Sequence, residues 1–347
     1  MKKYDLEEVF AKLLSRDQPF VFYRLPNTNN VHCNFQDDNS LLLTNDLKIN
    51  GFVMSRFDSP LPAVYVSAKN HLKFDYKTKA FESKGVVNLF HSEHKESFIK
   101  IVNKTKKVIA SGHLKKLVVA RKMTKSGGLD ALQLFTHLLT LYPQAMVYFW
   151  HHPKAETWVG ASPENLFSLH SGQLTTMALA GTLPYHPREK YNWGDKERKE
   201  QAWVRDTLQS DLKALFPSVA VKCSQTFTRR AGNLVHLCNE FSLEVEQVNM
   251  TALLKKLHPS PAVGGIPVEL GMSFLKEHEN LDRGYYTGFF GPVNGEDQID
   301  LFVNLRCAQI ISQDLQLYVG AGITQDSDPE KEWEETQNKA KTLLAAL

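Results

Sequence analysis

The last quarter of the chain contains the stretch Tyr318-Val-Gly-Ala-Gly-Ile-Thr-Gln-Asp-Ser-Asp-Pro-Glu-Lys-Glu-Trp-Glu-Glu-Thr-Gln-Asn-Lys339, around which the other motifs can be arranged. Residues 315–319 predict an apolar strand that runs into a glycine-rich loop. In that loop, Gly320 and Gly322 let the backbone approach a ligand without an intervening side chain. Residues 326–328 are Asp-Ser-Asp, which are favoured helix caps, and Pro329 suits the first position of a helix.

The helix predicted after this cap carries Glu332, Glu335 and Lys339. Their i, i+3 and i+7 spacing places two carboxylates and an ammonium on one face. Two acids beside a glycine-rich loop can hold a hard cation such as Mg²⁺, which leaves Lys339 for an anionic ligand. The structural alternative is a capped surface helix whose charges pair with one another.

The composition excludes several classes of protein. With 347 residues, of which 42% are apolar, the chain can form a substantial core. No segment is long and apolar enough to span a membrane, and the charged start lacks the apolar stretch of a signal peptide. A net charge of +3 without a Lys/Arg block argues against nucleic acid as a partner. The cysteines have no metal-binding spacing and indicate reduced thiols in a cytosolic protein; they are Cys33, Cys223, Cys238 and Cys307.

Hydrophobic periodicity predicts helices at residues 6–14, 98–109, 129–141, 195–215, 250–257 and 268–277. Strands are expected at residues 20–24, 31–35, 51–56, 63–67, 117–120, 145–150, 157–160, 165–170, 173–180, 235–245, 285–293 and 298–311. Turns are short throughout and no linker separates the elements. Long strands of antiparallel type mixed with exposed helices predict a single α+β domain, with two large antiparallel sheets packed face to face and flanked by helices.

Two residues are candidates for acid–base chemistry. Lys116 stands at the mouth of an apolar strand, where partial desolvation makes a lysine a usable base. Glu164 lies in a tight turn between two strands, where burial would raise its pKa and make it a general acid. The structural alternatives are a solvated strand end for the lysine and a turn acid that caps a neighbouring amide for the glutamate.

Further polar groups could bind anions or metal. Gly181 and Thr182 end a predicted strand with exposed N–H groups that can cradle a carboxylate, although a plain turn is equally compatible. Glu197 and Glu200 lie one turn apart on a polar helix. By themselves they indicate a solvated charged face, and they become a magnesium site only if they face Glu332 and Glu335.

Arg306 and His236 each interrupt an apolar strand. A charged residue in such a run is rarely buried without a partner, so Arg306 predicts an anionic ligand or a buried acid. His236 is compatible with a ligand contact or with a hydrogen-bonded histidine of the core.

The order of the motifs resembles the chorismate-utilising enzymes, which include isochorismate synthase, salicylate synthase and the first components of anthranilate and aminodeoxychorismate synthase. The resemblance covers about residues 95–347, and residues 1–90 resemble the variable N-terminal part of the same fold. It rests on Lys116-Leu-Val-Val-Ala-Arg, Gly160-Ala-Ser-Pro-Glu, Leu179-Ala-Gly-Thr, Lys199-Glu200, His258-Pro-Ser-Pro-Ala-Val-Gly-Gly-Ile-Pro, Asn304-Leu-Arg-Cys-Ala and Gly320-Ala-Gly-Ile with Glu332-Trp-Glu-Glu-Thr.

This resemblance implies one catalytic domain over residues 1–347, chorismate as substrate and Mg²⁺ as cofactor. Lys116 matches the base that activates water toward C2, and Glu164 matches the acid that helps the C4 hydroxyl to leave. The positions that match metal carboxylates, or lie beside them, are Glu200, Glu335, Glu332 and Glu197. The positions that match groups near the substrate are Gly181, Thr182, His236, Ala262, Tyr286, Arg306, Gly322 and Lys339.

The subtype depends on two positions. Family members that add ammonia usually lack a lysine where Lys116 stands, and Ala262 also resembles the isochorismate-synthase pattern. Tyr286 matches a tyrosine of salicylate synthases instead, so elimination of pyruvate after isomerisation stays open. Ala202 and Gly264 depart from an acid and a serine seen in relatives, which affects fine substrate contacts more than the reaction class.

The leading hypothesis is therefore an isochorismate synthase that serves menaquinone or catechol-siderophore synthesis. The alternatives are a salicylate synthase and a catalytically silent chorismate-binding subunit. A monomer in the cytosol is expected, with a dimer left open.

Overall fold

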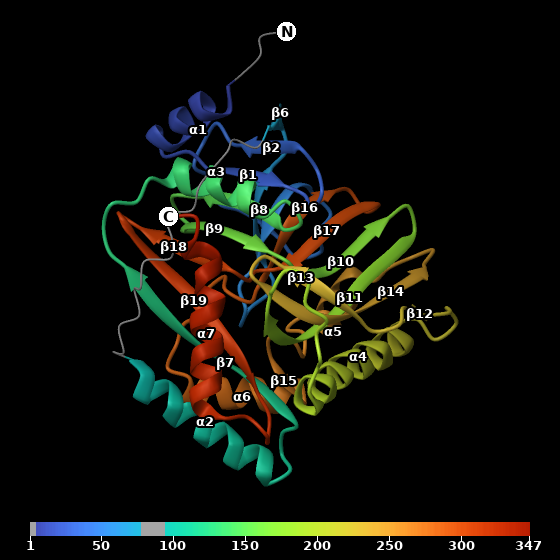
Figure 1. The fold of residues 1–347 in the computed structure, drawn as a ribbon. Coiled ribbons are helices and arrows are strands. Elements are labelled where there is room, and N and C mark those ends of the chain that lie inside the picture. The colour runs from blue at the N-terminus through green and yellow to red at the C-terminus, as the bar shows by residue number, and fades with distance from the viewer. Residues whose placement is uncertain (1–4, 78–93) are drawn as a thin grey trace.

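The computed structural model describes residues 5–77 and 94–347 (Figure 1). Residues 1–4 and 78–93 lie outside this description, and so does most of the expected boundary between the variable part and the motif-bearing part. The fold is α+β, with two large antiparallel sheets flanked by helices, as the sequence predicted. Among the described residues, no helix combines the length and apolarity needed to cross a membrane.

The first sheet, called sheet A here, contains strands from both ends of the chain. Within the described residues its antiparallel order is β15 (Gly265–Ile266), β7 (Lys116–Lys125), β19 (Asp314–Ile323), β18 (Cys307–Ile311), β9 (Thr157–Ser162), β8 (Met146–His151), β1 (Phe20–Arg24), β2 (Asn30–Phe35) and β6 (Asn70–Asp75). Near one end of this sheet, β7 pairs with β19 from Leu117 to Lys125, so that Val118 lies opposite Gly322 and Ala120 opposite Gly320.

The second sheet, sheet B, is also antiparallel. Within the described residues its order is β12 (Lys222–Cys223), β14 (Leu234–Glu244), β11 (Gln173–Pro184), β10 (Asn165–His170), β17 (Gln298–Val303), β16 (Phe289–Asn294), β4 (Asn50–Met54), β5 (Ala63–Ser67) and β3 (Leu42–Thr44), with β13 (Phe227–Ala231) also paired to β14. Ser171-Gly172 forms the tight turn between β10 and β11.

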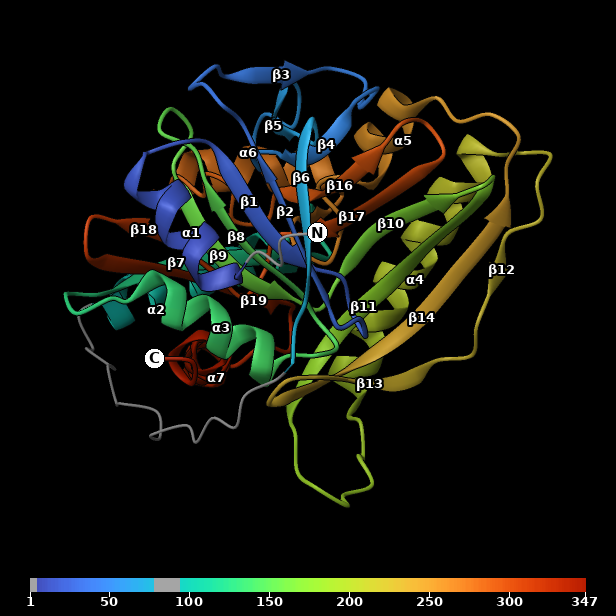
Figure 2. The ribbon, with the colours of Figure 1, turned by 90° about the horizontal axis from the view of Figure 1, so that it is seen from above.

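Helices flank both sheets, and their bounds agree closely with the periodicity of the sequence. They are α1 (Leu6–Ser15), α2 (Lys95–Ala110), α3 (Ala131–Leu141), α4 (Asp195–Leu215), α5 (Met250–Leu257), α6 (Val268–His278) and α7 (Pro329–Leu344). Helix α7 packs on β19 and against α2, while α4 packs on β11 and β14 of sheet B (Figures 1 and 2). Asp328 caps α7 by accepting hydrogen bonds from the amides of Glu330 and Lys331, and Pro329 follows it as predicted.

Aromatic side chains from both sheets meet in the space between them. The ring centroids of Tyr148 on β8 and Phe290 on β16 are 4.4 Å apart, and those of Trp150 and Phe52 are 6.3 Å apart. These contacts join sheet A to sheet B directly, and each large aromatic ring buries enough apolar surface to dominate the local packing energy. The two sheets therefore pack face to face.

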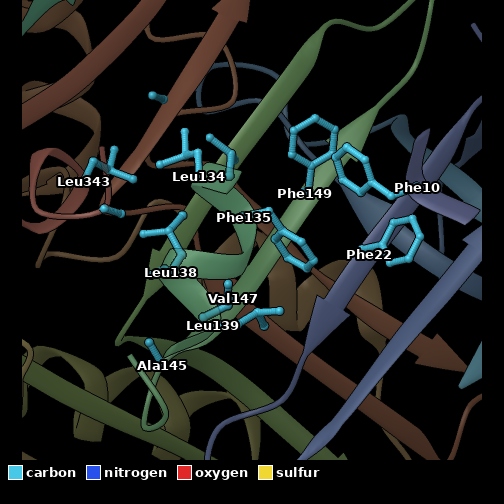
Figure 3. Close-up of a cluster of buried hydrophobic side chains, with 14 of the residues drawn as sticks. Phe10, Phe22, Leu134, Phe135, Leu138, Leu139, Ala145, Val147, Phe149 and Leu343 are labelled. Carbon is cyan, nitrogen blue, oxygen red and sulfur yellow. The ribbon is translucent and has the colours of Figure 1, made fainter. Parts of the chain in front are cut away.

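A second apolar cluster covers the other face of sheet A. Phe10 of α1, Phe135 of α3 and Phe149 of β8 point toward one another in this cluster (Figure 3). The stripe Leu134, Phe135, Leu138 and Leu139 on α3 is buried at the i, i+1, i+4 and i+5 positions expected of a core-facing helix. This packing fixes the strands that end at the site described below.

Two of the points at which the chain crosses between the sheets lie next to each other. Pro163 and Glu164 link β9 in sheet A to β10 in sheet B, and residues 304–306 link β17 in sheet B to β18 in sheet A. The crossings are hydrogen-bonded to each other, because the Val303 amide donates to Glu164 O at 3.0 Å and the Ala161 amide donates to Arg306 O at 3.1 Å. Glu164 and Arg306 are thereby brought together although about 140 residues separate them in sequence.

Several expectations about strands were wrong. Residues 298–311 are not one strand but β17 and β18, which belong to different sheets. Residues 285–288 form a turn with a left-handed Thr287 (φ 61°), so β16 begins only at Phe289. The glycine-rich loop is also absent among the described residues, because Gly320 and Gly322 lie within the long strand β19.

The Gly181 segment differs from prediction as well. Gly181 and Thr182 lie inside β11 at a bulge rather than at a strand end. The sequence analysis missed β3, β6, β12, β13 and β15, most of which are too short for periodicity to reveal.

Candidate functional site

One part of the site is formed by side chains on the face of α7 that packs against β19. Lys339 donates to Glu335 at 2.7 Å, one turn earlier on the helix, and to Gly320 O at 2.8 Å. Burial of Glu335 opposes its charge, but the Lys339 ammonium outweighs this effect and holds the pKa of the carboxyl below its usual range. The strand-loop-helix stretch of the sequence thus supplies a carboxylate and an ammonium to one place.

A second ion pair lies beside the first strand of the motif region. Lys116 is 1% exposed at the start of β7, and its Nζ is 2.9 Å from Glu200 Oε1 on α4. A Cβ built on Gly322 would overlap Glu200 Oε1 and lie 3.2 Å from Lys116 Cε. A side chain at position 322 would therefore displace the ends of the α4 acid and the β7 lysine, which both approach the backbone there. The Glu200 side chain is mostly buried, so it does not belong to a solvated charged face of α4.

Glu164 lies at the first sheet crossing and is 5% exposed. Desolvation raises the pKa of this carboxyl to about 7, although Lys116, Lys339 and Arg306 all act in the opposite direction. Because the pKa of Glu164 is still raised, the effect of burial is larger than the combined effect of the three nearby cations. At neutral pH a large fraction of Glu164 carries a proton and can donate it.

Arg306 lies at the second crossing rather than in a strand, with a left-handed φ of 49°. Desolvation lowers the pKa of its guanidinium to about 10, which still leaves it charged at neutral pH. Its nearest hydrogen-bond acceptors are uncharged and distant, namely Lys339 O at 3.4 Å, Thr342 Oγ1 at 3.5 Å and His236 Nε2 at 3.4 Å. A buried cation held so loosely favours an anionic ligand.

His236 on β14 is a neutral orienting group. Burial, followed by the charges of Arg306 and Lys339, lowers its pKa to about 3. Its Nδ1 donates to Gly181 O at 2.9 Å, so Nε2 is the unprotonated nitrogen that faces Arg306. Gly181 has a φ of 72°, and a Cβ there would lie 3.1 Å from Glu197 Cβ, so glycine is needed for both conformation and space.

Tyr286 lies against β19. Its ring stacks on Tyr318 with centroids 5.5 Å apart, and its hydroxyl lies 3.0 Å from the Cβ position of Gly320. Desolvation raises the pKa of Tyr286 well above the range of an ordinary tyrosine, so the hydroxyl remains a neutral donor.

These side chains line one pocket. Of the fourteen predicted site residues, twelve form its wall: Lys116, Glu164, Gly181, Thr182, Glu200, His236, Ala262, Tyr286, Arg306, Gly322, Glu335 and Lys339. Glu332 and Glu197 do not line it. The wall also contains residues that the sequence analysis missed, most of which are apolar and carry no chemical signal: Val118, Pro163, Leu179, Val263, Leu305, Tyr318 and Val319. Gly320, where the sequence predicted a close approach of the backbone to a ligand, lines the pocket as well.

A buried ion pair behind this wall was also missed. Arg283 and Glu279 are 2% and 3% exposed and meet at 2.6 Å. The Arg283 guanidinium donates to Val118 O at 2.8 Å and Val263 O at 3.1 Å, while Glu279 Oε1 accepts from the Ala120 amide at 2.7 Å. The pair thus makes hydrogen bonds to backbone groups of β7 that the short strand β15 does not reach. It also links Val118 and Val263, which both line the pocket. Its i, i+4 spacing resembled an ordinary surface pair in the sequence.

The carboxylates around the pocket fit a hard cation. Glu332 is 1% exposed, and its Oε2 accepts no hydrogen bond, although the nearby Ser327 hydroxyl favours the charged form. Burial, and then the neighbouring Glu335, raise the pKa of Glu332, which shows that the two acids act on each other. Carboxylate oxygens are the ligands Mg²⁺ prefers. Within residues 5–77 and 94–347, however, no three acidic, histidine or cysteine side chains are already grouped around one point.

Comparison with known proteins places the chain among enzymes that act on one type of substrate. The family model described as "Chorismate binding enzyme" matches residues 47–347 and so begins earlier than the sequence resemblance. Anthranilate synthase component 1 of Aquifex aeolicus is 30% identical over 264 residues, which are 73% of this chain and 53% of that protein. Isochorismate synthase MenF of Escherichia coli K12 is 30% identical over 267 residues, which are 74% of this chain and 61% of that protein.

The chain therefore spans less than two thirds of either relative's length. Among solved structures, the menaquinone-specific isochorismate synthase MenF of Escherichia coli superposes with a TM-score of 0.78 at 20% identity, over 95% of this chain and 88% of that chain. At this identity the likeness shows the fold alone. Aminating and isomerising relatives are equally similar in sequence, so the choice between them depends on the residues of the pocket.

Proposed function

The chain belongs to the family of chorismate binding enzymes, and from this premise we propose that it is a magnesium-dependent isochorismate synthase. The observation that carries the proposal is that Lys116 and Glu164 line the same pocket. A buried amine and a carboxylic acid with a pKa of about 7 in one pocket suit water addition at one ring carbon and departure of a hydroxyl at a second.

Chorismate carries two carboxylates, and the pocket has cations for both. Arg306 lacks a charged partner in the described structure, and Lys339 extends from α7 into the same space. Their charges, together with the neutral Tyr286 and His236, would orient the substrate rather than react with it. With the substrate held in this way, C2 would face Lys116 and the C4 hydroxyl would face Glu164.

In the proposed reaction, water bonds to C2 and gives its proton to the Lys116 amine. Both ring double bonds shift by one position, from C1=C2 to C1=C6 and from C5=C6 to C4=C5, and the C4–O bond breaks. Glu164 protonates the departing hydroxyl so that it leaves as water. One water enters and one leaves, so the conversion is an isomerisation and runs in both directions. Glu200 and Glu335 would hold the magnesium, with Glu332 and Glu197 nearby, and the ion would supply positive charge to the bound ring carboxylate.

The alternative reaction begins in the same way and continues with elimination of pyruvate to give salicylate. Tyr286 favours this alternative, because its hydroxyl stands in the pocket wall where it could position the side chain to be eliminated. A silent binding subunit is disfavoured, because Lys116, Glu164, Glu200 and Glu335 are all retained in one pocket. A cytosolic location is proposed on the four free thiols.

We expect the activity to depend on the protonation of Glu164. As a proton donor with a pKa of about 7, it is competent below that value, so kcat/KM should fall as the pH rises through about 7. Glu164→Gln should remove this limb and lower kcat by about 10²–10⁴-fold. Rates measured from pH 5.5 to 9, with the exposed Glu189→Gln as the matched control, test this. An unchanged profile in Glu164→Gln would contradict the acid role.

The function itself is tested by separating the products formed from chorismate and Mg²⁺. A chorismate–isochorismate mixture that is the same from either direction supports the proposal. Salicylate with equimolar pyruvate would support the alternative, an aromatic amine formed only with added ammonia would identify an aminating enzyme, and unchanged chorismate would identify a silent subunit. Isochorismate would then serve menaquinone or catechol-siderophore synthesis, since one solved relative is named menaquinone-specific and another 2,3-dihydroxybenzoate-specific.

A further inference from the structure

Three acids near the pocket are each paired with a lysine of their own. The pairs are Glu200 with Lys116 at 2.9 Å, Glu335 with Lys339 at 2.7 Å, and Glu332 with Lys196 at 2.5 Å. Lys116 and Lys339 belong to the pocket wall and have roles toward the substrate. Lys196 does not line the pocket, so its position calls for a different explanation.

Lys196 lies in the first turn of α4, one turn before Glu200. It reaches across to α7, where it donates a short hydrogen bond to Glu332 Oε1. Glu332 is 1% exposed, and its other oxygen accepts no hydrogen bond, so the lysine satisfies only half of a buried carboxylate. Burying a carboxylate oxygen without a hydrogen-bond donor destabilises the folded protein. A bound cation in contact with that oxygen would remove this destabilisation.

The surroundings of Lys196 are acidic on more than one side. Its ion-pair partner is Glu332, and the charges of Glu335 and Glu200 also act on the ammonium. Two of these acids belong to α7 and one to α4, so the lysine lies where the fields of both helices converge. A divalent cation held by the same acids would be strongly repelled by an ammonium left in place.

We propose that Lys196 is an internal counter-ion that competes with the divalent metal for Glu332. This inference rests on the proposed function, because it concerns the same metal site. When the metal binds, Lys196 must release Glu332. Breaking that ion pair costs free energy, so the net free energy of metal binding is less favourable. Before the metal binds, the lysine keeps the acids of α4 and α7 from repelling each other. Lys196 is thus a positioning residue and not a catalytic one.

The test is direct binding of Mn²⁺ to the purified full chain without chorismate, with free Mn²⁺ followed by electron paramagnetic resonance. Lys196→Gln should bind Mn²⁺ at least about tenfold more tightly than the wild type, since each tenfold corresponds to about 1.4 kcal/mol of lost competition. Lys199→Gln on the exposed side of the same helix should bind as the wild type does. Lys196→Arg keeps a cation and should retain weak binding.

Adding Glu332→Gln to Lys196→Gln should abolish the gain, because the contested ligand is then missing. A second readout is the rise in melting temperature on addition of Mg²⁺, which should be larger for Lys196→Gln than for the wild type. Equal or weaker metal binding by Lys196→Gln, or equal tightening by Lys196→Arg, would overturn the inference. If the wild type bound no Mn²⁺ even with chorismate present, the metal part of the proposed function would fail and the inference with it. Binding by the wild type with no gain in Lys196→Gln would remove the role of Lys196 alone.

Discussion

Replacing Lys116 with glutamine is expected to lower kcat for chorismate conversion by about 10²–10⁴-fold, the usual contribution of a general base. The reason is that the amine is 1% exposed, stands in the pocket wall, and is paired there with Glu200. Glutamine keeps much of the side-chain length but cannot take a proton from water. Steady-state rates at saturating Mg²⁺ and chorismate measure the effect.

Loss of the lysine also leaves Glu200 without its partner, so folding must be checked independently. Thermal unfolding and chorismate affinity of Lys116→Gln should show a folded protein that still binds its substrate. Lys115→Gln is the matched control, because the neighbouring side chain is exposed. Near-native turnover in Lys116→Gln would remove this residue from the mechanism.

Replacing Glu335 with glutamine is expected to raise the Mg²⁺ concentration needed for half-maximal activity and to lower the rate by at least about 10²-fold. A bound metal contributes several kcal/mol of charge stabilisation, and each 1.4 kcal/mol is a factor of ten in rate. Glu335 is the α7 acid that lines the pocket and is ionised beside Lys339. Glu200→Gln on α4 should behave in the same way, because both acids are assigned to one ion.

Activity titrated with Mg²⁺ after exhaustive chelation measures both variants. The exposed neighbour Glu334→Gln should titrate like the wild type. Wild-type activity that survives chelation, or a Glu335→Gln variant with the native requirement for Mg²⁺, would contradict the metal assignment.

The sequence predicted the elements that bear the site better than the path between them. The helix over residues 195–215 and the cap at Asp328 followed from periodicity and capping chemistry, which are local properties. The crossing at Arg306 could not be predicted, because residues 298–311 have the apolar pattern of a single strand. Tertiary packing determines that the strand before Arg306 joins sheet B and the strand after it joins sheet A. A local hydrophobic pattern carries no information about which sheet a strand joins.

The candidate residues were found mainly through resemblance, and their surroundings were not. Gly322 was expected to let the backbone approach a ligand, but the structure also places Glu200 and Lys116 against it. Glu332 was grouped with the metal acids, whereas it lies outside the pocket wall and pairs with Lys196. On a helix as rich in charge as residues 195–200, no sequence signal distinguishes the one lysine that turns inward.

The central claim is that this pocket adds solvent water to C2 of chorismate. The most direct measurement is incubation of the purified protein with chorismate and Mg²⁺ in water enriched in oxygen-18, followed by chromatography and mass spectrometry. We predict that the first isochorismate formed carries one oxygen-18 atom, and that the label also enters recovered chorismate through the reverse reaction. Isochorismate without label would mean that the hydroxyl group moves within the molecule, and the assignment of Lys116 as the water-activating base would then be contradicted.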